Sequence, residues 1–566
     1  MADDGSNTDG FMTEHMEFAD QLAGYVESEH PEFLVNKLYY DAYKKDMAAG
    51  TYPDVRSGLQ KLLKDGLLLF NYTGHGGTTA LSDEKVLTQT DINQFTYTHL
   101  PVWVTATCDF TRFDDLNTSA GEDVFLNKSS GGIALFTTVR VAYSRPNFPI
   151  NDNVIRNLFE RNNGRRRTLG EVMQATKNTL SSVYKLGFCL IGDPAVKMAY
   201  PEFGMKVTTV NGQAVDENSI SFKALEKITV EGEVLDASGQ LVTDFTGIVN
   251  PTVKDSKVTV TCLKNSNKDD TPAFTFTDYP NTIFIGNDSV RNGKFSFTFT
   301  VPKDISYSNL QGKMNLYAVD TENGHEAQGN FDNFIVGGTS DTAETDTIGP
   351  EIRALYLNDT TFVDGGQVNT TPYFVAELWD KSGVNITGSS VGHDMMLVID
   401  ESTVLSYNLN SYYELLPGEE GAGIVKFPIP ALEPGKHTAE FWVWDIQNNS
   451  TVRTFTFEVV EGLKPFLFDV IATPGIAREQ VTFHLMHNRP ESRMRVGIMV
   501  YDLAGRQLWK HEESGTSGLF ENYTVSWDLT CGGARMRPGV YIYRAAISTD
   551  NSKDATKARK FIILGE

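Results

Sequence analysis

Two side chains capable of nucleophilic catalysis each follow an apolar segment of this chain. The segment Gly66-Leu-Leu-Leu-Phe-Asn-Tyr-Thr-Gly ends at His75, and the segment Leu100-Pro-Val-Trp-Val-Thr-Ala-Thr ends at Cys108. Short runs of apolar and β-branched residues predict buried strands of a parallel sheet, and such sheets carry their chemistry at the carboxyl ends of the strands. We therefore expect His75 and Cys108 to lie side by side.

This pair supplies the nucleophile and the base that nucleophilic catalysis by a thiol requires. A cysteine attacks as its thiolate, so it needs an imidazole nearby to take its proton. Glycines at 74, 76 and 77 leave room for a substrate strand, and the Gly76 amide can face a developing oxyanion together with the Cys108 amide. A lone cysteine or histidine is more often structural, but the pair at two strand ends favours catalysis.

Length and composition limit what kind of protein this is. A chain of 566 residues is too long for one core and predicts three to five domains. The net charge of −24 argues against a nucleic-acid partner, which needs a surface rich in lysine and arginine. The four cysteines, at positions 108, 189, 262 and 531, are too few and too scattered for a disulfide framework and lack metal-ligand spacing.

The first 200 residues alternate between strand and helix patterns, which predicts a mostly parallel sheet with helices on both faces. The first helix has apolar residues at helical spacing, namely Met12, Met16, Ala19, Leu22 and Val26, and the chain is expected to begin inside a domain. The other expected helices are 54–64, 121–127 and one that opens with the capping box Thr168-Leu-Gly-Glu171 and runs to Lys185. The expected strands are 35–40, 67–71, 102–107, 132–139 and 188–191.

After Pro201 the helical periodicity disappears. Short strands rich in Val, Thr, Phe and Ile, separated by Gly, Asn, Asp and Pro turns, predict β-sandwiches to the end of the chain. We divide them into three domains, 201–348, 349–461 and 462–566, with a linker rich in Thr, Asp and Ser at 338–347.

The first 200 residues also resemble a known family. Asn71-Tyr-Thr-Gly-His75-Gly, the strand that ends in Cys108, and Phe188-Cys-Leu-Ile-Gly-Asp-Pro194-Ala resemble motifs of the gingipain family of cysteine peptidases. The resemblance implies a caspase-like fold over residues 1–200, with upstream sequence missing, and a dyad of His75 and Cys108. Alignment of Ala2-Asp3-Asp4-Gly5 with a family turn also places Asp3 where a glutamate orients the histidine.

The resemblance bears on substrate preference as well. Family members that cut after arginine have an acidic pocket residue three positions before a histidine that aligns with His15, and this chain has Met12 there. Tyr143 replaces a tryptophan of the pocket wall. Burying an arginine without a carboxylate partner is costly, so we expect a small or apolar residue at the cleaved position.

Two turns in the first two sandwiches place an Asp after a strand and before Asn residues, at Asp320 and Asp445, and these sandwiches resemble immunoglobulin-like modules. Such turns can bind calcium through carboxylate and carbonyl oxygens, but Asp and Asn also favour turns by local hydrogen bonding. Without a dense ligand cluster we prefer the local explanation. The expected reaction requires neither a metal nor an organic cofactor.

The last sandwich has an ordered series of hairpins, with Val496–Leu508, Trp527-Asp528, Arg537–Arg544 and Lys560–Leu564. The series resembles the C-terminal domain that directs proteins through the type IX secretion system of Bacteroidetes. This implies a cell-surface or outer-membrane location in a Gram-negative bacterium of that kind, and we attribute the lack of a signal peptide in this chain to truncation.

Three interpretations of the whole chain stay open. One is the sortase of that secretion system, with the C-terminal domains of exported cargo, anionic lipopolysaccharide and other outer-membrane components of the system as partners. The second is an exported proteinase that is itself cargo. The third is a non-catalytic surface scaffold, which the His75 and Cys108 pair disfavours; a low-pKa thiol at Cys108 would decide against it.

Overall fold

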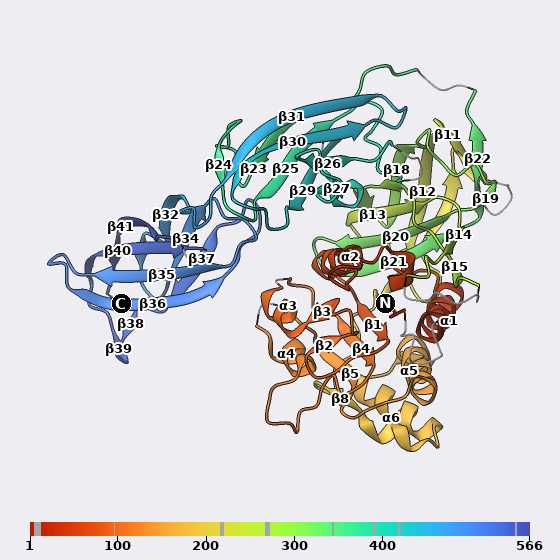
Figure 1. Cartoon of the computed structure of the whole chain (residues 1–566), viewed down its shortest axis with the longest axis horizontal. Helices are drawn as coiled ribbons and strands as arrows, with labels where there is room; N and C mark the ends of the chain where they lie inside the picture. Colours follow the sequence, from red (N-terminus) through yellow and green to blue (C-terminus); the bar gives the residue numbers. More distant parts are fainter. Residues whose placement is uncertain are drawn as a thin grey trace.

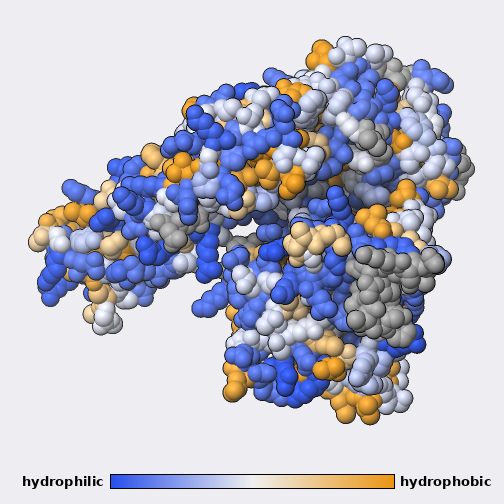
Figure 2. Space-filling model, viewed as in Figure 1, coloured by the Kyte–Doolittle hydropathy of each residue, from blue (hydrophilic) through white to orange (hydrophobic). Residues whose placement is uncertain are grey.

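The computed structural model describes residues 1–4, 13–95, 97–128, 130–162, 164–215, 220–265, 272–341, 345–388, 392–416, 419, 421–549 and 552–565. Figure 1 shows the N-terminal α/β region beneath the first group of sheets, with the last sheets extending away from both. Within the described residues, no helix is both long and apolar enough to cross a membrane. Figure 2 shows mostly hydrophilic residues on the same face, with hydrophobic ones scattered among them.

The N-terminal region is built on a four-stranded sheet with the order β1-β4-β5-β8. Its strands are β1 (Leu69–Thr73), β4 (Val102–Ala106), β5 (Ala134–Thr138) and β8 (Phe188–Ile191). The first three are parallel, and β8 pairs antiparallel with β5. Every residue of β4 and β5 is buried, as expected for strands covered on both faces.

Helices cover both faces of this sheet, as the sequence predicts. The helices are α1 (Glu14–Glu29), α2 (Pro53–Asp65), α3 (Gln89–Gln94), α4 (Ala120–Leu126), α5 (Ser144–Phe159) and α6 (Leu169–Thr179). Side chains of α2, α3 and α4 share one core with Phe70, Trp103 and Leu135 of the sheet. Side chains of α1, α5 and α6 share a second core with Val102, Val104 and Phe136 on the opposite face.

Two expectations for this region are wrong in detail, and one helix is missing from them. Residues 35–40 form no strand: Tyr39 makes a single bridge to Ala2, which also bridges Thr73 beside β1, and η1 (Tyr40–Ala42) follows. The helix that begins after Thr168 ends at Thr179 and is followed by η2 (Val183–Gly187). Helix α5 was not predicted because its sequence contains two prolines, of which Pro149 lies inside the helix.

From β9 onward the described residues contain strands and a single 3-10 helix, η3 (Asn410–Tyr412). The first group has a nine-stranded sheet, β10-β9-β12-β18-β17-β13-β20-β21 with β16 beside β13, and a three-stranded sheet, β11-β22-β19, around one core. Its strands are β9 (Phe203–Val210), β10 (Gln213–Ala214), β11 (Ile220–Ala224), β12 (Lys227–Leu235), β13 (Gly247–Lys254), β14 (Val258–Thr261), β15 (Thr275–Asp278), β16 (Thr282–Ile285), β17 (Asp288–Arg291), β18 (Lys294–Thr300), β19 (Leu310–Gln311), β20 (Lys313–Asp320), β21 (Glu326–Phe331) and β22 (Phe334–Thr339).

Two more pairs of sheets follow, each pair around its own core. The first pair contains β23 (Glu351–Leu357), β24 (Gln367–Val368), β25 (Tyr373–Trp379), β26 (Met396–Ile399), β27 (Ser406–Asn408), β28 (Tyr413–Leu415), β29 (Ala422–Pro428), β30 (Gly435–Trp444) and β31 (Ser450–Val459). The second contains β32 (Leu467–Thr473), β33 (Ile476–Ala477), β34 (Val481–His487), β35 (Met494–Tyr501), β36 (Gln507–Gly515), β37 (Tyr523–Trp527), β40 (Gly539–Ser548) and β41 (Ala555–Ile563), besides the short hairpin of β38 (Thr530–Cys531) and β39 (Ala534–Arg535). The caspase-like and immunoglobulin-like classifications, and the domain limits, stay predictions.

The N-terminal region packs firmly against the first group of sheets. Tyr39 and Met16 share a small core with Cys262 and Phe276, the latter on the hairpin β14–β15. The Asp41 carboxylate accepts hydrogen bonds from the backbone amides at 264 and 265 at 2.9 and 2.7 Å. These contacts hold the sheet that carries His75 and Cys108 against the β-rich part of the chain.

Candidate active site

The register of two strands brings His75 and Cys108 to the same place. Strands β1 and β4 are parallel neighbours, with Thr73 directly opposite Ala106. His75 follows Thr73 by two residues and Cys108 follows Ala106 by two, so both leave the same edge of the sheet at the same level. Adjacent strands are about 4.8 Å apart, which places the two backbones within reach of a shared substrate.

The loop after β1 packs directly on the end of β4. A side chain at Gly76 would place its Cβ 2.5 Å from the Thr107 Oγ1, so only glycine fits there. The His75 carbonyl accepts hydrogen bonds from the Tyr72 hydroxyl at 2.7 Å and the Ser82 amide at 2.9 Å. These contacts fix the loop that carries the imidazole.

The same loop determines where the Gly76 amide points. Gly76 bridges Leu81, at the end of the strand β2 (Ala80–Leu81), which pairs with β3 (Leu87–Thr88). The hydrogen bonds of the bridge come from its neighbours, Ser82 N–H to the His75 carbonyl and Gly77 N–H to the Ala80 carbonyl. In such a bridge the amide of the central residue points away from its partner, so Gly76 N–H is directed out of the hairpin. Its role towards an oxyanion stays a prediction.

The Cys108 thiol is half-buried and is held by the segment after β5. Its Sγ–H donates to the Ala142 carbonyl at 3.0 Å, and the Ala142 amide lies 3.4 Å from the Sγ. Burial raises the pKa of the Cys108 thiol, although the hydrogen bond to Ala142 acts in the opposite direction. The hydrogen bonds with Ala142 therefore fix the thiol beside the segment that follows β5.

Asp3 lies beside His75 and contacts its backbone, and its predicted role in orienting the imidazole stays a prediction. Its carboxylate is buried and accepts a hydrogen bond from the His75 amide at 3.0 Å. A Cβ at Gly74 would lie 2.4 Å from the Asp3 Cβ, so the chain start and the histidine loop fit closely together. Burial and the charges of Glu84 and Asp4 raise the pKa of Asp3.

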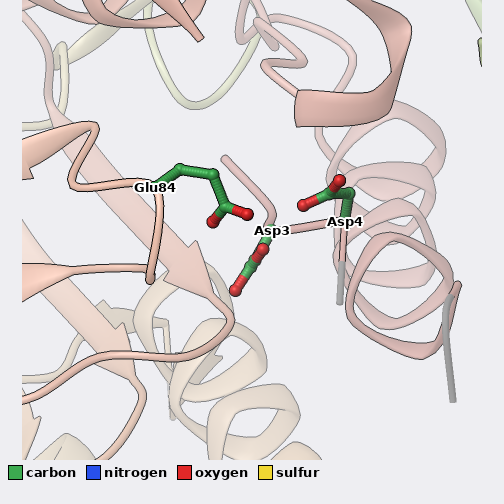
Figure 3. A group of neighbouring side chains, drawn as sticks. All are labelled: Asp3, Asp4 and Glu84. Carbon is green, nitrogen blue, oxygen red and sulfur yellow. The ribbon is translucent and has the colours of Figure 1, made fainter. Parts of the chain in front are cut away.

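Asp3 is part of a cluster of three carboxyl groups that sequence analysis did not find. One carboxylate oxygen each of Asp3, Asp4 and Glu84 lies within 4.8 Å of the others. Figure 3 shows the three side chains close together. The Lys45 ammonium lies 2.9 Å from Glu84 and 3.9 Å from Asp4, and the Tyr52 hydroxyl donates to Asp4 at 2.5 Å. The cluster could hold a cation of the oxygen-liganded kind, and Lys45 supplies part of its counter-charge.

A second carboxylate cluster lies beside one of the two sandwich turns. Asp346, Asp380 and Asp445 each place one oxygen within 4.8 Å of the others, and the preference for local hydrogen bonding over calcium at this turn stays a prediction. The cluster escaped notice because these residues come from a linker and two separate strand ends. Asp445 also makes the expected local bonds, accepting from the amides at 447 and 449 at 2.9 and 2.7 Å.

The start of α1 also reaches the site. The His15 ring lies 5.1 Å from the His75 ring in an edge-on arrangement. Its neighbour Glu14 is buried and accepts from the Ser144 hydroxyl at 2.9 Å and from the Arg145 Nε at 3.2 Å. Sequence analysis gave Glu14 no role. Its position next to His15, which aligns with the pocket histidine of the family, is the feature that could have indicated one.

Of the two predicted pocket residues, the structure describes Tyr143 but not Met12. Met12 lies outside the described residues. Tyr143 precedes α5, is 63% exposed and meets the Tyr184 ring edge-on at 5.9 Å. Its position next to Ser144, which contacts Glu14 on α1, places Tyr143 near the start of α1. Its contact with substrate stays a prediction.

Comparison with known proteins agrees with this geometry. Residues 1–199 match the sequence profile of Peptidase family C25. None of the curated proteins compared with the chain matches it. The dimeric latent PorU from Porphyromonas gingivalis is 36% identical, with 77% of this chain and 41% of that chain covered and a TM-score of 0.32. This chain thus spans less than half of the PorU chain that it matches.

Gingipain structures are also similar to the chain. The arginine-specific cysteine proteinase gingipain R is 18% identical over 57% of this chain and 62% of its own, with a TM-score of 0.29. A complex of the pro- and mature domains of Porphyromonas gingivalis RgpB is likewise 18% identical, over 57% of this chain and 64% of its own, with a TM-score of 0.29.

Proposed function

We propose that the protein is a cysteine endopeptidase in which His75 activates Cys108, and the match of residues 1–199 to Peptidase family C25 supports this proposal. The observation that carries the proposal is the register of β1 and β4, which sets Thr73 opposite Ala106 two residues before each reactive side chain. A nucleophile and its base on neighbouring strand ends suit acyl transfer.

The reaction would proceed by acyl transfer through a thioester. The His75 imidazole takes the proton from the Cys108 Sγ, and the thiolate attacks the carbonyl carbon of the scissile peptide bond. The Gly76 and Cys108 amides hold the oxyanion, which collapses as the imidazolium gives its proton to the leaving amine. Water or an amine then attacks the thioester and restores the thiol. Asp3 acts as a positioning residue, because its carboxylate holds the His75 amide at 3.0 Å.

The thiol must leave its resting contact before it reacts. The Cys108 Sγ–H group donates to the Ala142 carbonyl, with 3.0 Å between the sulfur and the oxygen, and burial raises the pKa of the thiol. Catalytic hydrogen bonds often form only when substrate is bound, so we infer that a bound peptide strand displaces the Ala142 contact and directs the Sγ proton to His75.

The finer role that we propose is that of a sortase of the type IX secretion system. The enzyme would cut before the C-terminal domain of an exported protein and pass the acyl group to an amine on anionic lipopolysaccharide. Two sequence features support this: residues 462–566 resemble a type IX C-terminal domain, and position 12 is Met where arginine-cutting relatives have an acid. The proposed location is the outer face of the outer membrane, with other components of the system as partners.

The exported proteinase is the alternative, and the fate of residues 462–566 separates the two. Cargo would lose this domain during export, whereas a sortase needs it as a lasting tether. We expect the mature surface protein to keep its C-terminal sequence through Gly565 and to co-purify with other type IX outer-membrane components. Recovery of only a form that ends near residue 462 would favour the proteinase.

The intact mass of a cargo protein tests the reaction itself. Purified enzyme is incubated with a protein that carries a type IX C-terminal domain, with and without anionic lipopolysaccharide. The proposal expects loss of the C-terminal domain in both samples and addition of the acceptor in the second, with Cys108→Ala inactive in each. Removal of the C-terminal domain without addition of the acceptor would support a peptidase but not a sortase. If the domain is not removed at all, the result contradicts both the peptidase and the sortase proposals.

A further inference from the structure

A basic cleft lies at the far end of α1 and α5 from Cys108. It has a volume of about 600 Å³ and is lined by Tyr25, His30, Arg156, Phe159, Arg161 and Arg166, besides two glutamates. Helix α1 carries His15 at its other end, beside His75, and a helix of 16 residues spans roughly 24 Å. The cleft is therefore separate from the candidate active site.

Two arginines of the cleft are stacked on aromatic rings. The Arg156 guanidinium lies 4.2 Å from the centre of the Tyr25 ring, and the Arg166 guanidinium lies 4.2 Å from the centre of the Tyr200 ring. Stacking uses the flat faces of the guanidinium and leaves its N–H edges for hydrogen bonds. The Arg156 edge donates to Asp152, and one N–H group of Arg166 donates to the Phe159 carbonyl. Because the aromatic rings limit the motion of the guanidinium groups, less side-chain entropy is lost when a ligand binds.

The rings also form a continuous wall. The His30 ring lies 5.8 Å from Tyr25 and 5.2 Å from Phe159, and burial lowers the pKa of His30, which favours the uncharged ring. Phe159 in turn lies 6.1 Å from Tyr200. A wall of this kind offers apolar contact to the carbon face of a ring-shaped ligand.

The charges in this part of the chain are unusual for so acidic a protein. The segment from Arg156 to Arg167 contains five arginines, whereas the whole chain has a net charge of −24. Arg156 is paired with Asp152 at 3.0 Å and Arg165 with Glu171 at 2.5 Å. Within the described part of the chain, Arg161 and Arg166 form no ion pair, although Glu29 and Glu160 line the same cleft.

The cleft also contains hydrogen-bond acceptors. The exposed Glu29 and Glu160 line it beside the arginines. Arginines suit a phosphate or carboxylate, glutamates accept from hydroxyl groups, and the aromatic wall suits a sugar ring. We propose that this cleft binds a saccharide that bears a phosphate or carboxylate group. A volume of about 600 Å³ lies within the usual range for small-ligand sites.

Titration calorimetry on the full chain tests the proposal with defined probes: glucose 6-phosphate, glucuronate, glucose and inorganic phosphate. Both charged sugars should bind at least tenfold more tightly than glucose or inorganic phosphate. Phosphate-bearing lipopolysaccharide and the same material after dephosphorylation distinguish a lipid-linked ligand from a free one. Either source would support the proposal, provided that the charged sugars alone also bind.

Variants locate the binding. The double variant Arg161→Gln and Arg166→Gln should weaken binding of glucose 6-phosphate at least tenfold. Arg165→Gln in the same hairpin should change it less than twofold, because the Arg165 guanidinium is already paired with Glu171. The thermal melting temperature of each variant shows whether it folds. The variant Tyr25→Ala leaves every arginine in place and should also weaken sugar binding.

Four results would overturn the proposal: no binding of either charged sugar, equal affinity for inorganic phosphate and glucose 6-phosphate, equal losses for Arg165→Gln and the double variant, or binding of a polyglutamate peptide in place of the sugars. The measurement does not require peptide cleavage, so failure of the thiol chemistry would leave its result interpretable.

Discussion

Helices α1 and α5 have different surroundings at their two ends. At their starts lie His15, Glu14 and Ser144, next to the histidine loop and its buried carboxylates. At their ends lie Arg156 and the hairpin of β6 (Arg161–Asn162) and β7 (Arg165–Arg166), beside Glu29 and Glu160. The starts therefore hold buried acidic groups, whereas the ends combine arginines with exposed glutamates.

The comparison explains how one small domain can offer two kinds of chemistry. Beside His75, the buried Asp3 carboxyl group accepts a hydrogen bond from the His75 amide and so fixes the loop that carries the imidazole. The arginines act on a separate surface that is exposed to solvent. Changes at the start of these helices should therefore affect bond cleavage, and changes at their ends should affect binding of an anion.

The largest expected effect comes from the dyad. Cys108→Ala and His75→Ala should each lower the cleavage rate of a peptide substrate by at least about a thousandfold, because residues that act as a unit fail together. Cleavage is followed by mass spectrometry of a peptide that spans a cargo cleavage site. Cys189→Ala, in the edge strand β8 of the same sheet, is the matched control and should stay active; activity in His75→Ala would contradict the assignment of the base.

Sequence analysis placed His75 and Cys108 at neighbouring strand ends because the relevant signals are local. The apolar pattern of each strand and the reactive residue that follows it can be recognised directly in the sequence. Parallel pairing of the two strands then places His75 and Cys108 at the same edge of the sheet. The residues around the dyad were harder to predict. Glu84 and Lys45 reach Asp4 from separate loops, and Ala142 meets Cys108 from the end of another strand.

The basic cleft was missed for a similar reason. Tyr25, Arg156 and Arg166 lie on three elements that only packing brings together, and α5 itself is hidden by its prolines. The segment 35–40 reads as a strand from its composition, but a strand needs a neighbour, and there only Ala2 bridges it. Partners of this kind are set by tertiary packing and cannot be read from local composition.

The second prediction tests the contact between Asp3 and the histidine loop. Asp3→Asn should slow peptide cleavage by about 10- to 100-fold, because an amide accepts the His75 N–H more weakly and carries no charge to stabilise an imidazolium. Asp4→Asn is the matched control within the same cluster, since Asp4 accepts from Tyr52 and not from the histidine loop. Unchanged rates for Asp3→Asn would make Asp3 a turn residue only.

The third prediction concerns the protonation of Cys108 without substrate. Burial raises the pKa of the thiol, so the reactive thiolate should increase with pH through a range above that of an ordinary cysteine. Alkylation by iodoacetamide, read at Cys108 by peptide mapping, should rise about tenfold between pH 7.5 and pH 8.5, with free glutathione as the reference thiol. A rate that levels off below pH 7 would indicate a thiolate already paired with an imidazolium and would contradict the resting contact with Ala142.

The smallest expected effect concerns specificity at the start of α1. The Glu14 carboxylate is held by Ser144 and Arg145, so it is poorly placed to pair with a substrate arginine. Profiling of wild-type protein with peptide libraries should therefore show little preference for arginine or lysine at the cleaved position. Arg145→Ala should release Glu14 and raise cleavage after arginine by about threefold, a small gain because Arg145 is itself well exposed and its ion pair is weak. Arg140→Ala, which breaks a surface pair with Asp114, is the control and should leave the profile unchanged. A strong arginine preference in the wild-type protein would show that another carboxylate fills the pocket and would remove the main argument for a sortase over a digestive proteinase.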